Sequence, residues 1–158
     1  MTDDNDCPPV VVRPPILFGG AFLLAVILEA LVPLGPGLGG GSIRTTALGI
    51  GFLLAGGALV FVAARTFQRA GTNLPTWKPV LALVEEGPYR YTRNPIYIGL
   101  LLFYFGLTTL LTSVWALLFM PIVLAVIHYG VVLREETFLT KKFGAAYTSF
   151  QARVPRWL

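Results

Sequence analysis

Residues 85–99 read EEGPYRYTRNPIYIG and join a polar, aromatic segment directly to a long apolar run. The Gly-Pro pair is typical of a turn, and Asn94 is a favourable N-cap residue before a proline that suits the first helical position. The stretch therefore predicts that a helix begins at Pro95. Its free N–H groups and positive dipole end would lie beside Arg93, which favours binding of a carboxylate or phosphate. The alternative is a plain membrane-helix start with an interfacial anchor of arginine and tyrosine.

The composition is that of a membrane protein. Of the 158 residues, 55% are hydrophobic and only 13% are charged, and the mean hydropathy is +0.72. A soluble domain of this length is far more polar. Lipid headgroups account for the net charge of +4, so we expect no nucleic-acid partner. One cysteine and one histidine make an internal disulfide impossible and lead us to expect no metal site.

Hydropathy predicts an all-α, polytopic fold with about four transmembrane helices. A helix rises about 1.5 Å per residue and must cross about 30 Å of hydrocarbon. The tail after the last apolar run has apolar residues at near-helical spacing, so we expect an amphipathic helix on the membrane interface over residues 135–152. Gly144 weakens the helix prediction in the middle of this range. The predicted spans are residues 16–34, 47–64, 96–111 and 114–133.

The domain organisation is simple, and the charges predict its orientation. Residues 1–15 are interpreted as a flexible tail, and residues 16–158 as a single membrane domain. If both termini and the connector 65–79 are cytoplasmic, that side holds every lysine and arginine except Arg44. Within the connector, Trp77 and Lys78 are typical of an interfacial anchor. The protein is thus expected in a membrane with its chemical segments facing the cytoplasm, which would be the inner membrane if the source is a bacterium.

Small residues within the spans indicate where helices approach each other. Gly51 and Ala55 have the small-xxx-small spacing of a close helix contact. Gly99 and Gly106 share one face of the third span with Phe103, a face that can pack tightly.

Two ionisable residues within the first and last spans have open roles. Glu29 lies near the end of the first span, where it either reaches the interface or faces the protein interior. His128 lies seven residues before Glu135, on the same helical face, and an interhelical hydrogen bond is expected for it.

The third and fourth spans are joined by the short link LTS at residues 111–113, so they must form an antiparallel hairpin. The hairpin returns the chain after Leu133 to the membrane face that holds Arg93. The segment REE, residues 134–136, is therefore expected near Arg93 although forty residues separate them. A solvated charge run at the end of a membrane helix is the plainer interpretation.

The two segments together resemble a known signature. GPYRYTRNPIYIG, then a hairpin, then REETFLTKKFGAAYTSFQARVPRW is similar to the isoprenylcysteine carboxyl methyltransferase and phospholipid methyltransferase superfamily of membrane enzymes. The resemblance covers residues 80–157, about half of the chain. It depends on order and spacing: R-[HN]-P-x-Y-x-G at a helix start, a second membrane helix, Glu-Glu, F-G-x-x-Y and V-P.

The resemblance implies an enzyme that binds S-adenosylmethionine at the cytosolic face and releases S-adenosylhomocysteine. It would methylate a lipophilic or lipidated acceptor within the membrane lipids, such as an isoprenylcysteine carboxylate or a phospholipid amine. Arg93, Glu135 and Glu136 are the catalytic residues that it implies. The cofactor contacts that it implies are Leu83, Val84, Tyr89, Asn94, Pro95, Ile96, Tyr97, Glu135 and Glu136.

The chemistry of methyl transfer suits these residue types. Positive charge is lost from a sulfonium in an in-line displacement, so the enzyme mainly positions the two reactants and excludes water. Glu135 could hold the ammonium or ribose hydroxyls of the cofactor, and Arg93 or the helix start its carboxylate. Tyr89 or Tyr97 could wall the adenine.

The sequence departs from the prenylcysteine enzymes at two places. Asn94 stands where those enzymes have histidine, and Val131 and Val132 stand where some of them have arginine. Two other classes remain open: an NADPH-dependent membrane reductase related to the sterol reductases, and a non-enzymatic membrane scaffold. Asn94 and Ile96 depart from the R-H-P-N-Y element of the reductases. A scaffold gives no reason to gather charges at one face.

Overall fold

The computed structural model describes residues 7–36, 41–72 and 80–158, and Trp77 and Lys78 lie outside them. Every regular element in these ranges is a helix, which confirms the predicted all-α membrane fold. The elements are α1 (Pro14–Leu31), α2 (Ile43–Arg69), η2 (Gly87–Arg90), α3 (Pro95–Leu111), α4 (Val114–Ile127), the π-helical turn η3 (His128–Val132), α5 (Leu133–Phe143) and α6 (Ala145–Arg153).

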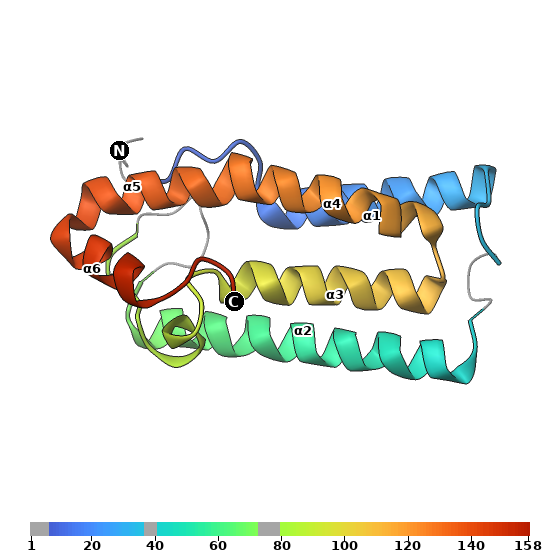
Figure 1. Ribbon diagram of the computed structural model, residues 1–158, viewed down its shortest axis with the longest axis horizontal. Helices are drawn as coiled ribbons and strands as arrows, with labels where there is room; N and C mark the ends of the chain where they lie inside the picture. The colour runs from blue at the N-terminus through green and yellow to red at the C-terminus, as the bar shows by residue number, and fades with distance from the viewer. Residues whose placement is uncertain (1–6, 37–40, 73–79) are drawn as a thin grey trace.

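Helices α1 to α4 run antiparallel along the long axis of the molecule (Figure 1). Within the described ranges α1, α2 and the 30-residue rod formed by α4, η3 and α5 are long and apolar enough to cross a membrane. The apolar helix α3 has 17 residues, the lower limit for a membrane span. The rod continues ten residues beyond the predicted end of the fourth span and carries α5 out of the bundle.

Helices α2 and α3 pack backbone to backbone through paired glycines. A Cβ atom on Gly56 would lie 2.6 Å from the carbonyl oxygen of Gly99, and one on Gly49 would lie 3.0 Å from that of Gly106. The predicted tight face of α3 is confirmed. The prediction that Gly51 packs is wrong, because Gly51 is exposed and nothing lies within 4 Å of its Cβ position.

The hairpin between α3 and α4 is confirmed, and it explains Glu29. Thr112 turns the chain with φ 50°, and Ser113 caps α4 by accepting from the N–H of Ala116. Glu29 is buried, and its carboxylate accepts from the Ser113 hydroxyl at 2.9 Å and from the N–H of Trp115. Of the two alternatives for Glu29, the structure thus shows the one that faces the protein interior, because α4 begins beside it with donors that need an acceptor.

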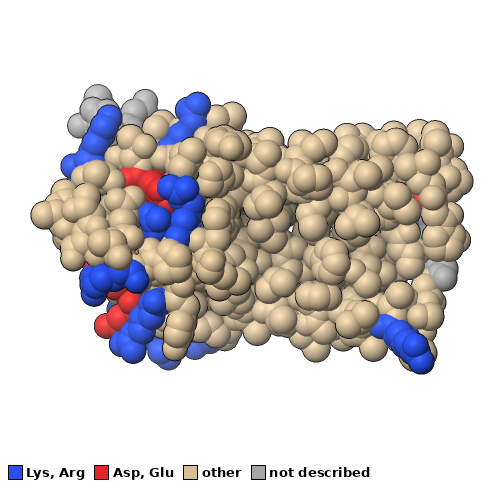
Figure 2. Space-filling model, viewed as in Figure 1, with Lys and Arg blue, Asp and Glu red and all other residues tan. Residues whose placement is uncertain are grey.

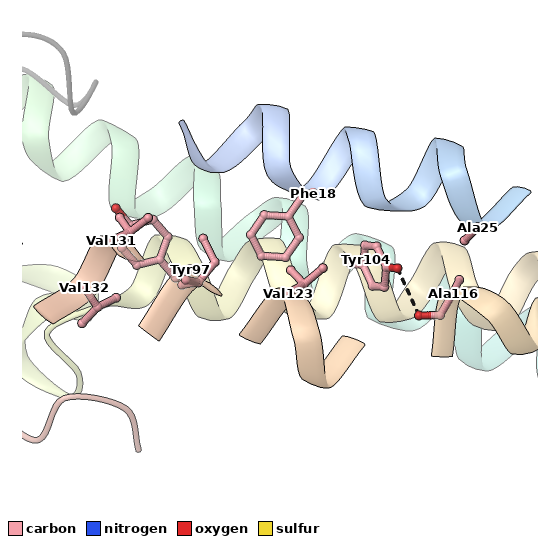
Figure 3. Packing of buried hydrophobic residues seen from close by; sticks show 9 residues of the cluster. Phe18, Ala25, Tyr97, Tyr104, Ala116, Val123, Val131 and Val132 are labelled. Atoms are coloured by element: carbon pink, nitrogen blue, oxygen red, sulfur yellow. Dashed lines mark hydrogen bonds between the residues drawn. The ribbon is translucent and has the colours of Figure 1, made fainter. Parts of the chain in front are cut away.

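The core of the bundle lies where α1, α3 and α4 meet (Figure 3). Phe18 of α1 contacts the ring of Tyr104 edge-on at 6.1 Å between centroids, and Val123 of α4 packs in the same cluster. The Tyr104 hydroxyl donates to the carbonyl of Ala116 at 3.0 Å. The core therefore fixes α3 against α4 and sets where the start of α3 and the end of α4 lie.

The predicted closing helix over residues 135–152 is wrong in one respect. Gly144 adopts φ +55°, a conformation that glycine permits and that strains other residues. At this residue the predicted helix divides into α5 and α6. At this break the chain turns, and its C-terminal end returns to the start of α3 (Figure 1). Charged side chains gather at this end of the molecule, over α5 and α6, whereas the opposite end shows little charge (Figure 2).

Candidate active site

A pocket of about 120 Å³ opens at the charged end of the bundle. Its walls come from the end of α2, the segment 80–90, the start of α3, and the helices α5 and α6. The ends of this set are more than eighty residues apart in the sequence, and the hairpin of α3 and α4 and the break at Gly144 bring them together. The pocket is thus a product of the whole fold.

The segment before η2 is pinned by a buried threonine. The Thr72 hydroxyl oxygen accepts from the N–H groups of Leu81 and Ala82, at 2.8 and 3.3 Å. This places the apolar side chains of Leu83 and Val84 in the pocket wall. The adjoining Tyr89 is buried against Phe67, 5.2 Å between ring centroids.

Burial raises the pKa of the Tyr89 hydroxyl well above its ordinary value, and the nearby Glu135 adds to the rise. The phenol is therefore neutral at all physiological pH values. A neutral aromatic ring beside aliphatic side chains makes this part of the pocket suited to a flat, weakly polar group.

Helix α3 begins at Pro95, as predicted. Asn94 occupies the N-cap position, but its side chain makes no capping bond, so the predicted cap is wrong in its chemistry. Its Nδ2 instead donates to the carbonyl of Arg156 at 2.9 Å, and the Thr92 hydroxyl donates to the same oxygen at 3.1 Å. The side chain is engaged by the C-terminal segment, which leaves the helix start facing the pocket through Ile96 and Tyr97.

Arg93 lines the pocket with its side chain only 10% exposed. Its Nη1 lies 2.8 Å from Oε1 of Glu136 as an ion pair. Nε and Nη1 are both buried and make no well-formed hydrogen bond to a described residue, so Nη1 has its ion pair alone and Nε has neither contact. A buried donor without a partner is costly, so Nε is a natural contact for an acceptor from a ligand.

The two adjacent glutamates have different surroundings. Glu135 accepts from the Tyr97 hydroxyl at 2.7 Å through Oε1, and within the described ranges no cation pairs with it. Glu136 accepts from Nε and Nη2 of Arg156 at 2.9 and 2.8 Å and also pairs with Arg93. Glu136 is thus neutralised by protein groups, whereas Glu135 faces the pocket without such a partner. Burial raises the pKa of the Glu135 carboxyl to about 7, so a cationic ligand would favour its charged form.

Tyr147 of α6 lies beside this ion cluster. Burial raises the pKa of its hydroxyl to about 12; Glu136 adds to the rise, and a hydrogen bond with Arg93 opposes it. The hydrogen bonds to Glu136 likewise raise the pKa of Arg156. The guanidinium groups and the phenol therefore keep one protonation state across the physiological range.

Most of the predicted site residues come together here. Pro95 is buried beneath the helix start and is not among the pocket-lining residues. The predicted residues that line the pocket are Leu83, Val84, Tyr89, Arg93, Asn94, Ile96, Tyr97, Glu135 and Glu136.

Several residues of the site escaped the sequence analysis. Leu139 lies one turn after Glu135, and Tyr147 and Phe150 are three apart on α6, so helical spacing could have indicated them. Arg156 lies behind the pocket, and the only local signal for it is its place after the Val-Pro pair. The other lining residues that were missed are Pro8, Phe67, Val80 and Ala82.

The segment before α1 closes one side of the pocket. Pro8 is buried and lines it. The N–H of Val11 donates to the carbonyl of Gly130 in η3 at 3.0 Å, and Nη1 of Arg134 donates to the carbonyl of Pro9 at 3.3 Å. The π-helical turn thus receives the N-terminal segment beside the helix that carries the glutamates.

His128 makes the hydrogen bond expected of it, but with a different kind of partner. Its Nδ1 accepts from the indole N–H of Trp157 at 3.3 Å, and the two rings lie 6.0 Å apart. The partner belongs to the C-terminal segment after α6 and not to another helix. His128 is outside the lining of the pocket.

Comparisons with known proteins bear on this arrangement. Residues 44–146 match the family model described as phospholipid methyltransferase. A stretch of 73 residues is 32% identical to the Protein-S-isoprenylcysteine O-methyltransferase of Schizosaccharomyces pombe; it covers 46% of this chain and 31% of that protein. The chain thus matches less than a third of the length of that relative. No solved structure matches the chain.

Proposed function

Because the chain belongs to the phospholipid methyltransferase family, we propose that it transfers a methyl group from S-adenosylmethionine to an amphiphilic acceptor at the membrane surface. One observation carries the proposal. The pocket presents a carboxylate, Glu135, and a buried guanidinium nitrogen, Nε of Arg93; among the described residues the first has no cationic partner and the second no acceptor. Such a site is matched by a ligand that carries both signs of charge.

The residues present fit S-adenosylmethionine. This molecule carries a sulfonium and an ammonium, a carboxylate and an adenine ring. Glu135 supplies the charge that the cationic groups need, and Arg93 with the open start of α3 supplies donors for the carboxylate. Leu83, Val84 and Tyr89 offer an apolar wall for the adenine.

When bound, the cofactor would supply an electrophilic methyl group on sulfur. The chain's own residues then have three tasks. Glu135 and Arg93 hold opposite ends of the charged moiety and so fix its orientation, which is the main requirement of an in-line displacement. The apolar wall and Pro8 exclude water from the reacting atoms. Tyr97 holds the Glu135 carboxylate in place through their hydrogen bond.

The depth of the site supports an amphiphilic acceptor. Glu135 lies 21 residues after Val114, which begins the rod at the opposite face. At about 1.5 Å per residue this is about 32 Å, the thickness of the hydrocarbon core. The pocket therefore lies at the level of the lipid headgroups, where a phospholipid amine or the carboxylate of a lipidated peptide resides.

A cytoplasmic orientation of the site is part of the proposal. It is supported by the charged end of the molecule, which holds α5, α6 and the end of α2 (Figure 2). The test introduces Leu34→Cys, at the opposite end, into a Cys7→Ser background. A membrane-impermeant thiol reagent should label it only from outside the cell. Labelling from the cytoplasmic side would overturn the orientation.

The binding test titrates detergent-purified protein with S-adenosylhomocysteine and, separately, with NADPH. We expect binding of the first only, and the reverse would favour a reductase. A hydrogen bond to a charged group contributes about 1.5–3 kcal/mol, so Glu135→Gln and Arg93→Gln should each weaken S-adenosylhomocysteine binding about ten-fold or more. Glu86→Gln and Arg90→Gln, both exposed and outside the pocket, are the matched controls.

The acceptor is identified with methyl-labelled S-adenosylmethionine and membranes containing the protein. Label in the lipid extract identifies a lipid acceptor, and label in an added prenylated cysteine peptide identifies a prenylcysteine carboxylate. The Glu135→Gln variant sets the background. Transfer to both acceptors at only this background level would contradict the proposed acceptor class. It would not contradict the proposed cofactor, which the binding titration tests independently.

A further inference from the structure

We propose that Glu136 acts on the active site as a positioning residue, through Arg156, and that Glu135 alone of the two glutamates contacts the cofactor. The proposal rests on the proposed function and names the division of labour within its site. It decides which of the two carboxylates named by the resemblance meets the ligand. It gives a role to residues 154–157, which we call the C-terminal strap and which follow the residues that match the family model.

The C-terminal strap is bound to the turn that precedes α3. The N–H of Arg93 donates to the carbonyl of Pro155 at 3.0 Å. The hydroxyl of Thr92 and the amide of Asn94 both donate to the carbonyl of Arg156. Three consecutive residues of the turn thus hold a segment that lies more than sixty residues away in the sequence.

The same strap fixes Glu136. The guanidinium of Arg156 makes a bidentate contact with both oxygens of the carboxylate, and Nη1 of Arg93 approaches Oε1 from another direction. Planar, bidentate pairs of this kind hold both partners in one geometry. Glu136 is 8% exposed, so its carboxylate is shielded from solvent, whereas the side chain of Arg156 is 34% exposed.

The net charge around Glu136 differs from that around Glu135. Arg93, Arg156 and Glu136 together carry one net positive charge, so this cluster repels a sulfonium or ammonium. Glu135 is adjacent in the sequence but bonds to Tyr97 and lines the pocket, and no described lysine or arginine forms an ion pair with it. A cationic group of the cofactor is therefore attracted by Glu135 and not by Glu136.

The ion cluster has a second effect, on Arg93. With Nη1 held by Glu136, the guanidinium is oriented while its Nε stays without an acceptor in the pocket wall. The strap is tied at its far side as well, where the indole of Trp157 donates to His128 in η3. Arg156 thereby links the start of α3 to the helix that carries both glutamates, and fixes the donor that the ligand meets.

The test is a double-mutant cycle on S-adenosylhomocysteine affinity with Glu136→Gln and Arg156→Gln. Each single variant should weaken binding by about five-fold or more. The double variant should bind no worse than the single variant with the larger loss of affinity, because the two side chains act as one unit. Independent, multiplying effects would overturn the proposal, since Glu136 would then contact the ligand itself. Arg153→Gln, whose partner Glu85 is outside the pocket, should bind as the parent does.

A conservative variant separates positioning from folding. Arg156→Lys keeps the charge but loses the bidentate geometry, so we expect an unchanged unfolding temperature and weaker S-adenosylhomocysteine binding. Parent-like affinity in this variant and in Arg156→Gln would overturn the proposal.

Hydrogen exchange at residues 92–94 gives a readout that needs no ligand. Exchange there should quicken in Arg156→Lys and not in Arg153→Gln, and unchanged exchange would also overturn the proposal. If the parent chain does not bind S-adenosylhomocysteine, the proposed function fails, and the exchange result still decides whether Arg156 holds the turn.

Discussion

The contact of α2 with α3 makes a sharp prediction for Gly56. A Cβ atom there would lie 2.6 Å from the carbonyl oxygen of Gly99 and 2.7 Å from the backbone nitrogen of Phe103. Both are backbone atoms of a helix and cannot rotate away. The neighbouring Gly57 has nothing within 4 Å of its Cβ position. Gly56→Ala must therefore separate the two helices, whereas Gly57→Ala adds a methyl group to open space.

The two variants should differ in the sign of their effect on stability. Inserting a methyl group into a filled contact costs about 1–3 kcal/mol. Alanine in place of glycine at an unhindered helix position stabilises by about 0.5–1 kcal/mol. The difference between Gly56→Ala and Gly57→Ala is thus about 1.5–4 kcal/mol in the free energy of unfolding.

Thermal unfolding of both variants in one detergent measures this difference. Because α3 begins beside Arg93, the shift of α3 in Gly56→Ala should also weaken S-adenosylhomocysteine binding. Gly57→Ala should bind as the parent does. Equal unfolding temperatures for the two variants would refute the packing argument.

Three further predictions follow from buried polar groups. Asn94→Asp keeps the side-chain shape but loses the donor to Arg156, so it should lower the free energy of unfolding by about 1–3 kcal/mol; a melting curve identical to that of the parent would contradict this. Glu29→Gln should lower the unfolding temperature and leave S-adenosylhomocysteine affinity unchanged, because its partners cap α4 at the end away from the pocket; a loss of affinity without a loss of stability would reverse that assignment. The pKa of Tyr147 is raised from 10.0 to about 12, so the native state retains a proton that the unfolded state releases, and the free energy of unfolding should fall as the pH rises from about 10 toward 12. Tyr147→Phe should lessen this fall in urea titrations at pH 9 and pH 11. An equal fall in both proteins would argue against a buried hydroxyl.

The features predicted correctly from the sequence depend on local rules or on lipid. Apolar runs must form helices because hydrocarbon cannot satisfy open backbone groups. The link at residues 111–113 is too short for anything but a hairpin, so the approach of Glu136 to Arg93 could be predicted without knowing any side-chain contact. Pro95 could be assigned as a helix start because proline lacks the N–H that the first turn does not use.

The features that were not predicted depend on a partner elsewhere in the chain. Gly51 and Gly56 both lie among small residues of α2, and only the position of α3 decides that Gly56 is the contact. Glu29 turns inward because Ser113 and Trp115 present donors at the start of another helix. Nothing near Arg156 in the sequence indicates Glu136, since the turn at Gly144 brings them together.

The placement of Pro8 has a consequence for diversification among related enzymes. Pro8, in the segment before α1, lines one side of the pocket, whereas the match to the family model begins at residue 44. Substitutions on that side leave the two motifs of the candidate site unchanged. Under the proposed function, selectivity for the methyl acceptor could therefore change there without a change in the residues that would hold the cofactor, and enzymes with the same two motifs need not share a substrate.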